Sequence, residues 1–282
     1  MKTTMAGQDR AAARSKVRAV RRVPDETKES QVTRDTRSVT AKVLSMLEAF
    51  TPATPALSLT ELARRSGVSL PTAHRRAAEL TSWGALERGC DGRYRIGLRL
   101  YEVAALAPRG LGLREAAMPF LEDLYEVTHE NVQLAVREGL EVVFVERIAG
   151  WEAVPVRTRV GGRFALHATG VGLVLLAHAP ADVQRQALSA PLHGYTAKTI
   201  TEPERLRSVL ATVRRHGYAV SDGQVTLDAV SVAAPVRDAD GDVVAAVSLV
   251  VRAEDAQPRT LAPLVQSAAR GISRALVSRF AG

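Results

Sequence analysis

Residues 58–97 read SLTELARRSGVSLPTAHRRAAELTSWGALERGCDGRYRIG. This stretch predicts two short helices, the second of which carries His74, Arg75 and Arg76. A strand–turn–strand follows, with Asp91 and Gly92 at its turn. Two helices and a hairpin in so short a stretch form the outline of a winged helix-turn-helix, a module that binds DNA.

The two helices have recognisable boundary signals. Ser58 and Glu61 form an S-x-x-E capping box, which predicts the start of the first helix. Ser69 can cap the second helix, which is expected at about residues 70–82. Pro71 is tolerated in its first turn because the amide that proline lacks would be unpaired there.

The second helix is expected to present one face to DNA. Ala73, Ala77 and Leu80 fall on one side and should face the core, which turns Arg75 and Arg76 to solvent. Arginine suits both guanine and phosphate. A solvated helix face with two arginines is nevertheless common, so this helix alone is a weak signal. The candidate DNA contacts of this segment are Ser69, Pro71, Thr72, His74, Arg75 and Arg76.

The hairpin would form a wing beside this helix. Strands at residues 86–88 and 93–96 flank a loop whose glycines suit a tight turn. Arg88, Arg93 and Arg95 are expected to lie along the phosphate backbone or to reach a minor groove. Ordinary exposed strand residues would produce the same pattern. The assignment of the hairpin as a DNA-binding wing therefore depends on the helix beside it.

The basic charge lies in the N-terminal third of the chain. Residues 1–100 hold 19 Lys and Arg against 10 Asp and Glu, whereas residues 101–282 hold 19 against 20. Nucleic acid is the natural polyanionic partner, because phosphate contacts supply most non-specific affinity. Residues 1–36 lack hydrophobic periodicity and are predicted to be a disordered basic tail, which could also serve only to keep the protein in solution.

Length and composition indicate a two-domain protein of the cytoplasm. The 282 residues suffice for two compact domains, and the longest apolar runs are far too short to span a bilayer. The Arg-rich start lacks the apolar region of a secretory signal. The single cysteine, Cys90, excludes an internal disulfide and fits a reducing compartment. We therefore expect no membrane partner.

Domain boundaries follow from these patterns. A winged helix-turn-helix domain is expected at residues 37–97, a linker helix at 98–112 and an α+β domain at 113–282. In the α+β domain an antiparallel sheet with flanking helices would be large enough to enclose a small-molecule pocket. Its expected strands are 132–136, 142–148, 154–159, 229–236 and 243–251, and its expected helices are 113–129, 167–179, 201–217 and 260–280.

Several motifs resemble those of IclR-type bacterial transcriptional regulators. They are LTELARRSGVSLPTAHRRAAEL, YRIGL, VGGRFALHATGVGLVLLA, YTAKTIT, RRHGYAVSDGQ and VSVAAPVRDADGDVVAAVSL, in the family's order and spacing. The resemblance covers about residues 37–280. It implies a regulator without cofactor, in which a winged helix-turn-helix is joined to a GAF- or profilin-like domain for effector binding and oligomerisation.

The resemblance also implies an effector site in the second domain. Residues 169–171 correspond to the loop that approaches the ligand in the family, and further pocket positions fall between residues 222 and 250. Glycine at the start of this helix would bring backbone amides up to a ligand, but it would equally allow close packing. The candidate effector-binding residues are Thr169, Gly170, Val171, Asp222, Ser231, Ser248 and Val250.

The sequence departs from the family's pattern in ways that bear on the effector. Leu173 replaces a customary lysine, and Gln224 stands where an acidic residue is common, which implies a pocket with fewer charges. Val250 stands where some relatives that bind small oxo-acids have serine. A larger or more apolar effector is therefore expected. Each of these positions could instead serve core packing.

Two other classes of protein fit parts of the sequence. An enzyme with an auxiliary DNA-binding head would need a catalytic constellation, but the chain has no G-x-S-x-G and no H-E-x-x-H, and its six histidines show no metal-ligand spacing. No catalytic or metal-binding residue is therefore assigned, although a triad could assemble from distant positions. A non-specific architectural protein would leave the second domain without a role. The preferred hypothesis is a homodimer, or a dimer of dimers, on a partly palindromic operator.

Removal of residues 1–36 tests the role of the tail. Because its nine Lys and Arg would release counterions from DNA, the truncated chain should bind any duplex more weakly and with a smaller salt slope. Fluorescence anisotropy of a labelled random duplex over a range of KCl concentrations measures both quantities. An unchanged slope would show that the tail does not touch phosphate.

Overall fold

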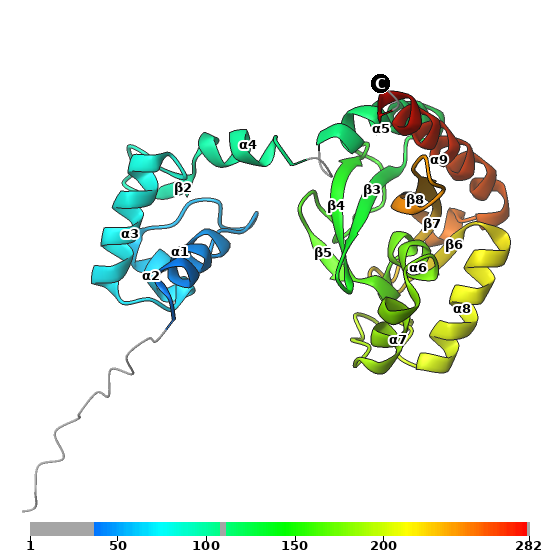
Figure 1. Cartoon of the computed structure of the whole chain (residues 1–282), viewed down its shortest axis with the longest axis horizontal. Coiled ribbons are helices and arrows are strands. Elements are labelled where there is room, and N and C mark those ends of the chain that lie inside the picture. Colours follow the sequence, from blue (N-terminus) through cyan, green and yellow to red (C-terminus); the bar gives the residue numbers. More distant parts are fainter. Residues whose placement is uncertain (1–36, 108–110, 281–282) are drawn as a thin grey trace, which may run out of the picture.

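The computed structural model describes residues 37–107 and 111–280 of the chain. Figure 1 shows an N-terminal domain, coloured blue to cyan, and a larger C-terminal domain, coloured green to red, with helix α4 between them. The predicted basic tail lies outside the described residues. The expected α+β class, with a winged helix-turn-helix ahead of an antiparallel sheet and flanking helices, is confirmed.

The N-terminal domain has three helices and a short hairpin. The predicted capping box is present, since the Ser58 hydroxyl accepts from the Glu61 amide and the Glu61 carboxylate accepts from the Ser58 amide. Gly67 ends the same helix with a φ of 65°, a conformation that favours glycine. The elements are α1 (Val39–Glu48), α2 (Leu59–Ser66), α3 (Leu70–Trp83), β1 (Leu86–Arg88) and β2 (Tyr94–Ile96).

The core of this domain joins its helices to the hairpin. Met46 of α1 and Leu62 of α2 are fully buried, and Leu86 and Tyr94 of the hairpin pack into the same cluster. Burial of one such leucine is worth about 1.5–3 kcal/mol relative to exposure. Leu57 forms an antiparallel bridge with Tyr94, so the segment ahead of α2 pairs with strand β2 of the wing through this one residue.

Helix α4 (Leu98–Ala104) links the domains and is shorter than predicted. Its last turn tightens, because the amides of Leu106 and Ala107 bond to carbonyls three residues back instead of four. At the far end of the linker, α5 begins at Leu111, inside the range 98–112 that was expected for the linker helix.

The C-terminal domain is built on a six-stranded antiparallel sheet with the order β5-β4-β3-β8-β7-β6. One face of the sheet carries the long helices α5 (Leu111–Thr128) and α9 (Pro258–Phe280). The other face carries α6 (Gly170–Ala177), α7 (Ala181–Ser189) and α8 (Pro203–His216). The strands are β3 (Asn131–Glu138), β4 (Glu141–Ile148), β5 (Arg163–Ala165), β6 (Ala219–Asp222), β7 (Ala229–Arg237) and β8 (Val243–Arg252), with short 3-10 turns η1 (Leu166–Ala168) and η2 (Ala253–Asp255).

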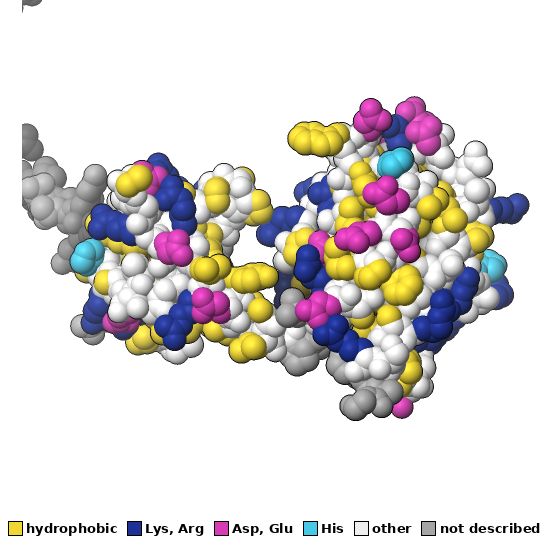
Figure 2. Space-filling model, turned by 90° about the horizontal axis from the view of Figure 1, so that it is seen from above, with side chains coloured by type: hydrophobic (Ala, Val, Ile, Leu, Met, Phe, Trp, Pro, Cys, Tyr) yellow, Lys and Arg dark blue, Asp and Glu magenta, His cyan; other side chains and the backbone are white. Residues whose placement is uncertain are grey.

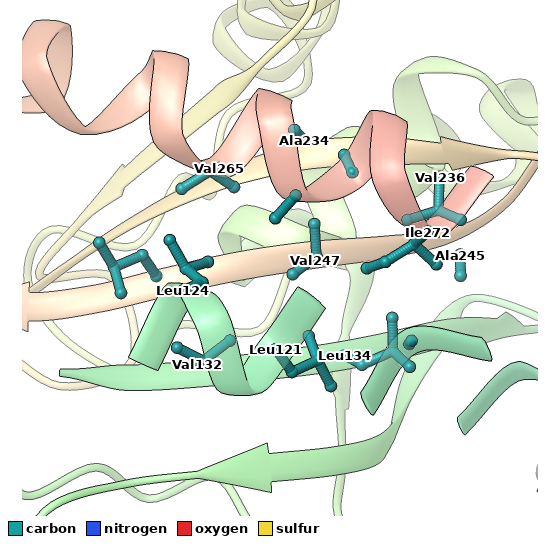
Figure 3. Close-up of a cluster of buried hydrophobic side chains, with 14 of the residues drawn as sticks. Leu121, Leu124, Val132, Leu134, Ala234, Val236, Ala245, Val247, Val265 and Ile272 are labelled. Carbon is teal, nitrogen blue, oxygen red and sulfur yellow. The ribbon is translucent and has the colours of Figure 1, made fainter. Parts of the chain in front are cut away.

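Each face of this sheet has its own apolar core. In Figure 3, Leu121 of α5 and Ile272 of α9 lie against side chains from three neighbouring strands. Because side chains alternate along a strand, Val132 and Leu134 face this core while Gln133 faces α6. Both faces are covered, so residues that alternation alone would place in solvent are buried.

Two local predictions are wrong. Residues 154–159 do not form a strand, and the edge of β4 pairs instead with β5. Pro155 has no amide to donate to a ladder, and the carbonyl of Val154 accepts from the Asn131 side chain. The helix expected from residue 201 begins instead at Pro203, after the N-cap residue Glu202, and no side chain caps it.

The helix predicted at residues 167–179 begins later than expected. Leu166–Ala168 forms the 3-10 turn, and Thr169 then caps α6 by accepting from the Gly172 amide at 3.0 Å. Helix α7 and strand β6 had no counterpart in the sequence prediction. Within residues 37–107 and 111–280, helices with the length and apolar character needed to cross a membrane are absent.

Leu121→Ala tests the core beneath α5. Leu121 is fully buried, so the truncation is expected to lower the free energy of unfolding by about 2–5 kcal/mol. Val127 lies on the same helix with 70% of its surface exposed, and Val127→Ala should change it by less than about 0.5 kcal/mol. Urea unfolding of both variants measures the difference, and equal losses would contradict the placement of the core.

Candidate DNA interface and effector pocket

Helix α3 has a buried face of small residues and an exposed face with polar side chains. Ala73 and Ala77 are fully buried, as predicted, whereas His74 and Arg75 are exposed. No hydrogen bond or ion pair joins Arg75 to another of the described residues, so its guanidinium is available to a ligand. Figure 2 shows Lys and Arg side chains interspersed with Asp and Glu over one face of the N-terminal domain.

Two residues of this helix differ from their predicted environment. Ser69 occupies the N-cap position, but its hydroxyl donates to the Thr72 hydroxyl at 2.9 Å and caps no backbone amide. Arg76 was expected to face solvent, yet its side chain is only 14% exposed and bonds Glu79 at 2.6 Å. A long side chain folds back readily to a partner three residues along the helix. Pro71 is exposed at the start of the helix, as expected.

The wing arginines divide by their partners. Arg95 pairs with Asp91 inside the hairpin at 2.7 Å. Arg93 reaches outside the hairpin to Glu61 of α2 at 3.1 Å. Arg88 bonds a carbonyl of the turn and lies over the Tyr94 ring, and it is the one predicted wing contact with no carboxylate partner among the residues that the structure describes.

Both carboxylates stay ionised at neutral pH. The amide and hydroxyl of Ser58 donate to Glu61, and with the nearby Arg93 they hold the pKa of Glu61 below its usual value. The hydrogen bond from Arg95, joined by one from the Arg93 amide, lowers the pKa of Asp91 in the same way. In the two wing ion pairs, Arg93–Glu61 and Arg95–Asp91, both partners are therefore charged at neutral pH.

The C-terminal domain contains a pocket between the sheet and the start of α6. It encloses about 410 Å³, its open mouth included, and every lining residue is uncharged. The lining residues are Gln133, Phe144, Val156, Thr158, Ala168, Thr169, Gly170, Val171, Ser221, Gln224, Val225, Thr226, Ala229, Ser231 and Val250.

Five of the seven candidate effector residues line this pocket. They are Thr169, Gly170, Val171, Ser231 and Val250. Asp222 lies outside it, where its exposed carboxylate pairs with Lys198 at 2.8 Å. Ser248 is fully buried behind the lining, in register with Gln133 and Ala233, and its hydroxyl has no hydrogen-bond partner. The structure thus brings five positions together and separates two.

Sequence reasoning missed most of the polar lining. Gln133 is 3% exposed, and its amide donates to the Thr158 hydroxyl at 2.7 Å. Ser221, also unassigned from the sequence, donates to the Ala168 carbonyl, and Gln224, whose position the family resemblance does indicate, accepts from the Ile200 amide. The available signal was the polar residue in the middle of an apolar strand, because a buried amide requires a partner.

The glycines at the start of α6 are required by packing. A Cβ on Gly170 would lie 2.7 Å from the Ser231 hydroxyl oxygen, and one on Gly172 would lie 2.2 Å from the Leu166 carbonyl oxygen. Close packing therefore explains both positions. The amides of Gly170 and Val171 precede the first backbone bond of α6 and both residues line the pocket, whereas Thr169 caps the Gly172 amide.

Comparison with known proteins identifies both domains. Residues 39–89 match the model of the IclR helix-turn-helix domain. Residues 106–274 match the model of the C-terminal domain of bacterial transcriptional regulator IclR. The chain belongs to the IclR family. This family member is accordingly a DNA-binding transcriptional regulator.

Individual relatives agree with the family assignment. The IclR-family chain is 32% identical to the regulator BhcR of Paracoccus denitrificans, over 79% of this chain and 82% of that protein. It is 30% identical to the Escherichia coli regulator XynR, over 83% and 95%. Among solved structures, the Thermotoga maritima IclR has a TM-score of 0.71 at 27% identity, with 84% of this chain and 98% of that one covered.

A further solved structure is an IclR homologue of Microbacterium hydrocarbonoxydans in complex with 4-hydroxybenzoate. It is 39% identical to this IclR-family chain, with a TM-score of 0.81, and the match covers 85% of this chain and 99% of that one.

Arg75→Ala tests the DNA-facing side of α3. Loss of an unpaired arginine from a base edge should cost about 1–3 kcal/mol of discrimination and so reduce selectivity between a preferred site and random DNA. A site selected by the wild-type regulator from a random duplex pool supplies the probe for gel-shift competition. Arg205→Ala in α8 is the charge-matched control. If the two variants show equal selectivity, Arg75 is not a DNA contact.

Proposed function

We propose that this regulator acts in the cytoplasm as a homodimer or a dimer of dimers on a partly palindromic operator. In this proposal two copies of α3 enter successive major grooves, and a small effector in the C-terminal pocket changes their spacing. The observation that carries the proposal is an uncharged, partly polar pocket in the same chain as an exposed recognition helix.

Exposed apolar side chains support the pairing of two copies. In the N-terminal domain, Val39 and Leu44 of α1 are each more than half exposed. In α4, Leu98 is 64% and Tyr101 66% exposed, and Leu106 just after this helix is 81% exposed. Exposed apolar side chains on α1 and α4 indicate surfaces that are covered in the assembly.

The proposed DNA contacts follow from the partners described above. Arg75 and Arg88 are the leading contacts because neither meets a carboxylate, and Ser69, Pro71, Thr72 and His74 surround the start of α3. Arg76, Arg93 and Arg95 are each paired with a carboxylate, of Glu79, Glu61 and Asp91, which competes with phosphate for the guanidinium.

The proposed effector is a small, largely apolar acid. Phe144, Val156 and Val225 supply apolar walls. No lining side chain is a cation that could pair with a second acidic group on the ligand, so a ligand with one carboxylate is favoured. The carboxylate would meet the hydroxyls of Thr169 and Ser231 and the first amides of α6, where a helix favours negative charge. The Microbacterium hydrocarbonoxydans homologue, whose ligand is an aromatic hydroxy acid, supports this class.

Thermal denaturation with 4-hydroxybenzoate tests the effector class. Ligand at about 100 times Kd should raise Tm by roughly 5–10 °C, because binding to the folded state adds about 2.7 kcal/mol. The neutral analogue 4-hydroxybenzyl alcohol should raise Tm less. Ser231→Ala should weaken binding about tenfold through loss of a hydrogen bond to the carboxylate, whereas the surface control Ser208→Ala should not. No shift with any aromatic acid tested would overturn the proposed class.

A further inference from the structure

We propose that Arg93 is a positioning residue of the DNA interface, which holds the wing against the start of α2 through Glu61 and leaves Arg88 as the wing's contact to phosphate. The proposal concerns only the DNA-binding domain and does not depend on the identity of the effector. It revises the sequence-based expectation that all three wing arginines lie along the backbone of DNA.

One carboxylate oxygen joins the wing to α2. The Arg93 guanidinium donates to the Glu61 Oε2 atom at 3.1 Å and to the Ala56 carbonyl at 3.2 Å. The same Glu61 oxygen accepts from the amide and from the hydroxyl of Ser58, each at 2.8 Å. The capping box of α2 therefore doubles as the attachment point of the wing.

The neighbouring backbone forms the second half of this attachment. Leu57 donates to the Tyr94 carbonyl at 3.0 Å, and Tyr94 donates to the Leu57 carbonyl at 2.7 Å. Each wing strand is only three residues long, and an isolated two-stranded hairpin is marginally stable in water. The wing accordingly depends on contacts outside itself for its orientation.

The three wing arginines are not equivalent in this respect. The Arg95–Asp91 pair lies wholly inside the hairpin, so it stiffens the turn without fixing the direction of the wing. Arg88 has no acidic partner in the described part of the chain. Arg93 alone of the three reaches a carboxylate in another element.

The exposure of the pair decides where its effect should appear. Arg93 and Glu61 keep 46% and 38% of their side-chain surface exposed, and an exposed ion pair adds little to folding stability. A change in wing direction, by contrast, displaces Arg88 from phosphate. The consequence should therefore be measured in DNA binding and not in melting temperature.

Glu61→Gln separates positioning from direct contact by the sign of its effect. Glutamine at this position can still accept from the Ser58 amide, so the cap of α2 is retained. If Arg93 positions the wing, the full-length variant should bind a labelled random duplex about threefold more weakly. If Arg93 is a phosphate ligand, removal of the competing carboxylate should strengthen binding.

Glu79→Gln is the matched control for charge. It removes a carboxylate from α3, where Glu79 holds Arg76, and leaves the wing attachment intact. Loss of a negative charge without loss of the attachment should strengthen binding. Equal effects of Glu61→Gln and Glu79→Gln, or unchanged affinity in Glu61→Gln, would overturn the proposal.

A double-mutant cycle with salt titration completes the test. Arg93→Gln should weaken binding in the wild-type background but have little further effect on affinity or salt slope in Glu61→Gln. Arg93→Lys should restore most of the affinity, because it preserves the ion pair. Arg88→Gln should lower the slope by about 0.9 in the wild-type background and by less in Glu61→Gln, where Arg88 is already displaced from phosphate. A drop of that size caused by Arg93→Gln in both backgrounds would instead assign Arg93 to phosphate.

Discussion

The sheet of the C-terminal domain is covered on both faces, and this constraint determines how the pocket is made. A strand buried on both sides has no solvent face on which to place polar residues. Asn131 and Gln133 nevertheless face α6, where they are almost fully buried. Their amides bond the Val154 carbonyl and the Thr158 hydroxyl, which draws the segment after β4 across the end of the sheet. The polar lining of the pocket follows from this need for hydrogen bonds.

The N-terminal domain meets a different constraint, since it must expose cations and still hold a small hairpin in place. Alanines on α3 allow close packing, which leaves the opposite side of that helix to solvent. Carboxylates then occupy some of these cations and not others. Glu79 binds Arg76 and Glu61 binds Arg93, whereas Arg75 has no carboxylate partner among the described residues. Charge count alone therefore overstates the number of side chains that are available to DNA.

The start of the link between the domains packs against the end of α3. A Cβ on Gly97 would lie 2.2 Å from the Gly84 carbonyl oxygen, so the ends of α3 and β2 pack backbone to backbone. Arg99 of α4 lies 4.6 Å from the centre of the Trp83 ring and donates to the Trp83 carbonyl. The direction of α4 is thus set by the end of α3.

The sequence by itself determined helices α2 and α3 of the N-terminal domain, the hairpin, the two long strands β7 and β8 and the family, because caps, glycine stops and turns act over a few residues. It also supplied five of the pocket positions through the family resemblance. Only the tertiary structure decided the partners of Arg93 and Gln133, which lie 32 and 25 residues away along the chain. It also decided that residues 154–159 leave the sheet. Those outcomes depend on burial and on contacts between distant segments, which no local pattern contains.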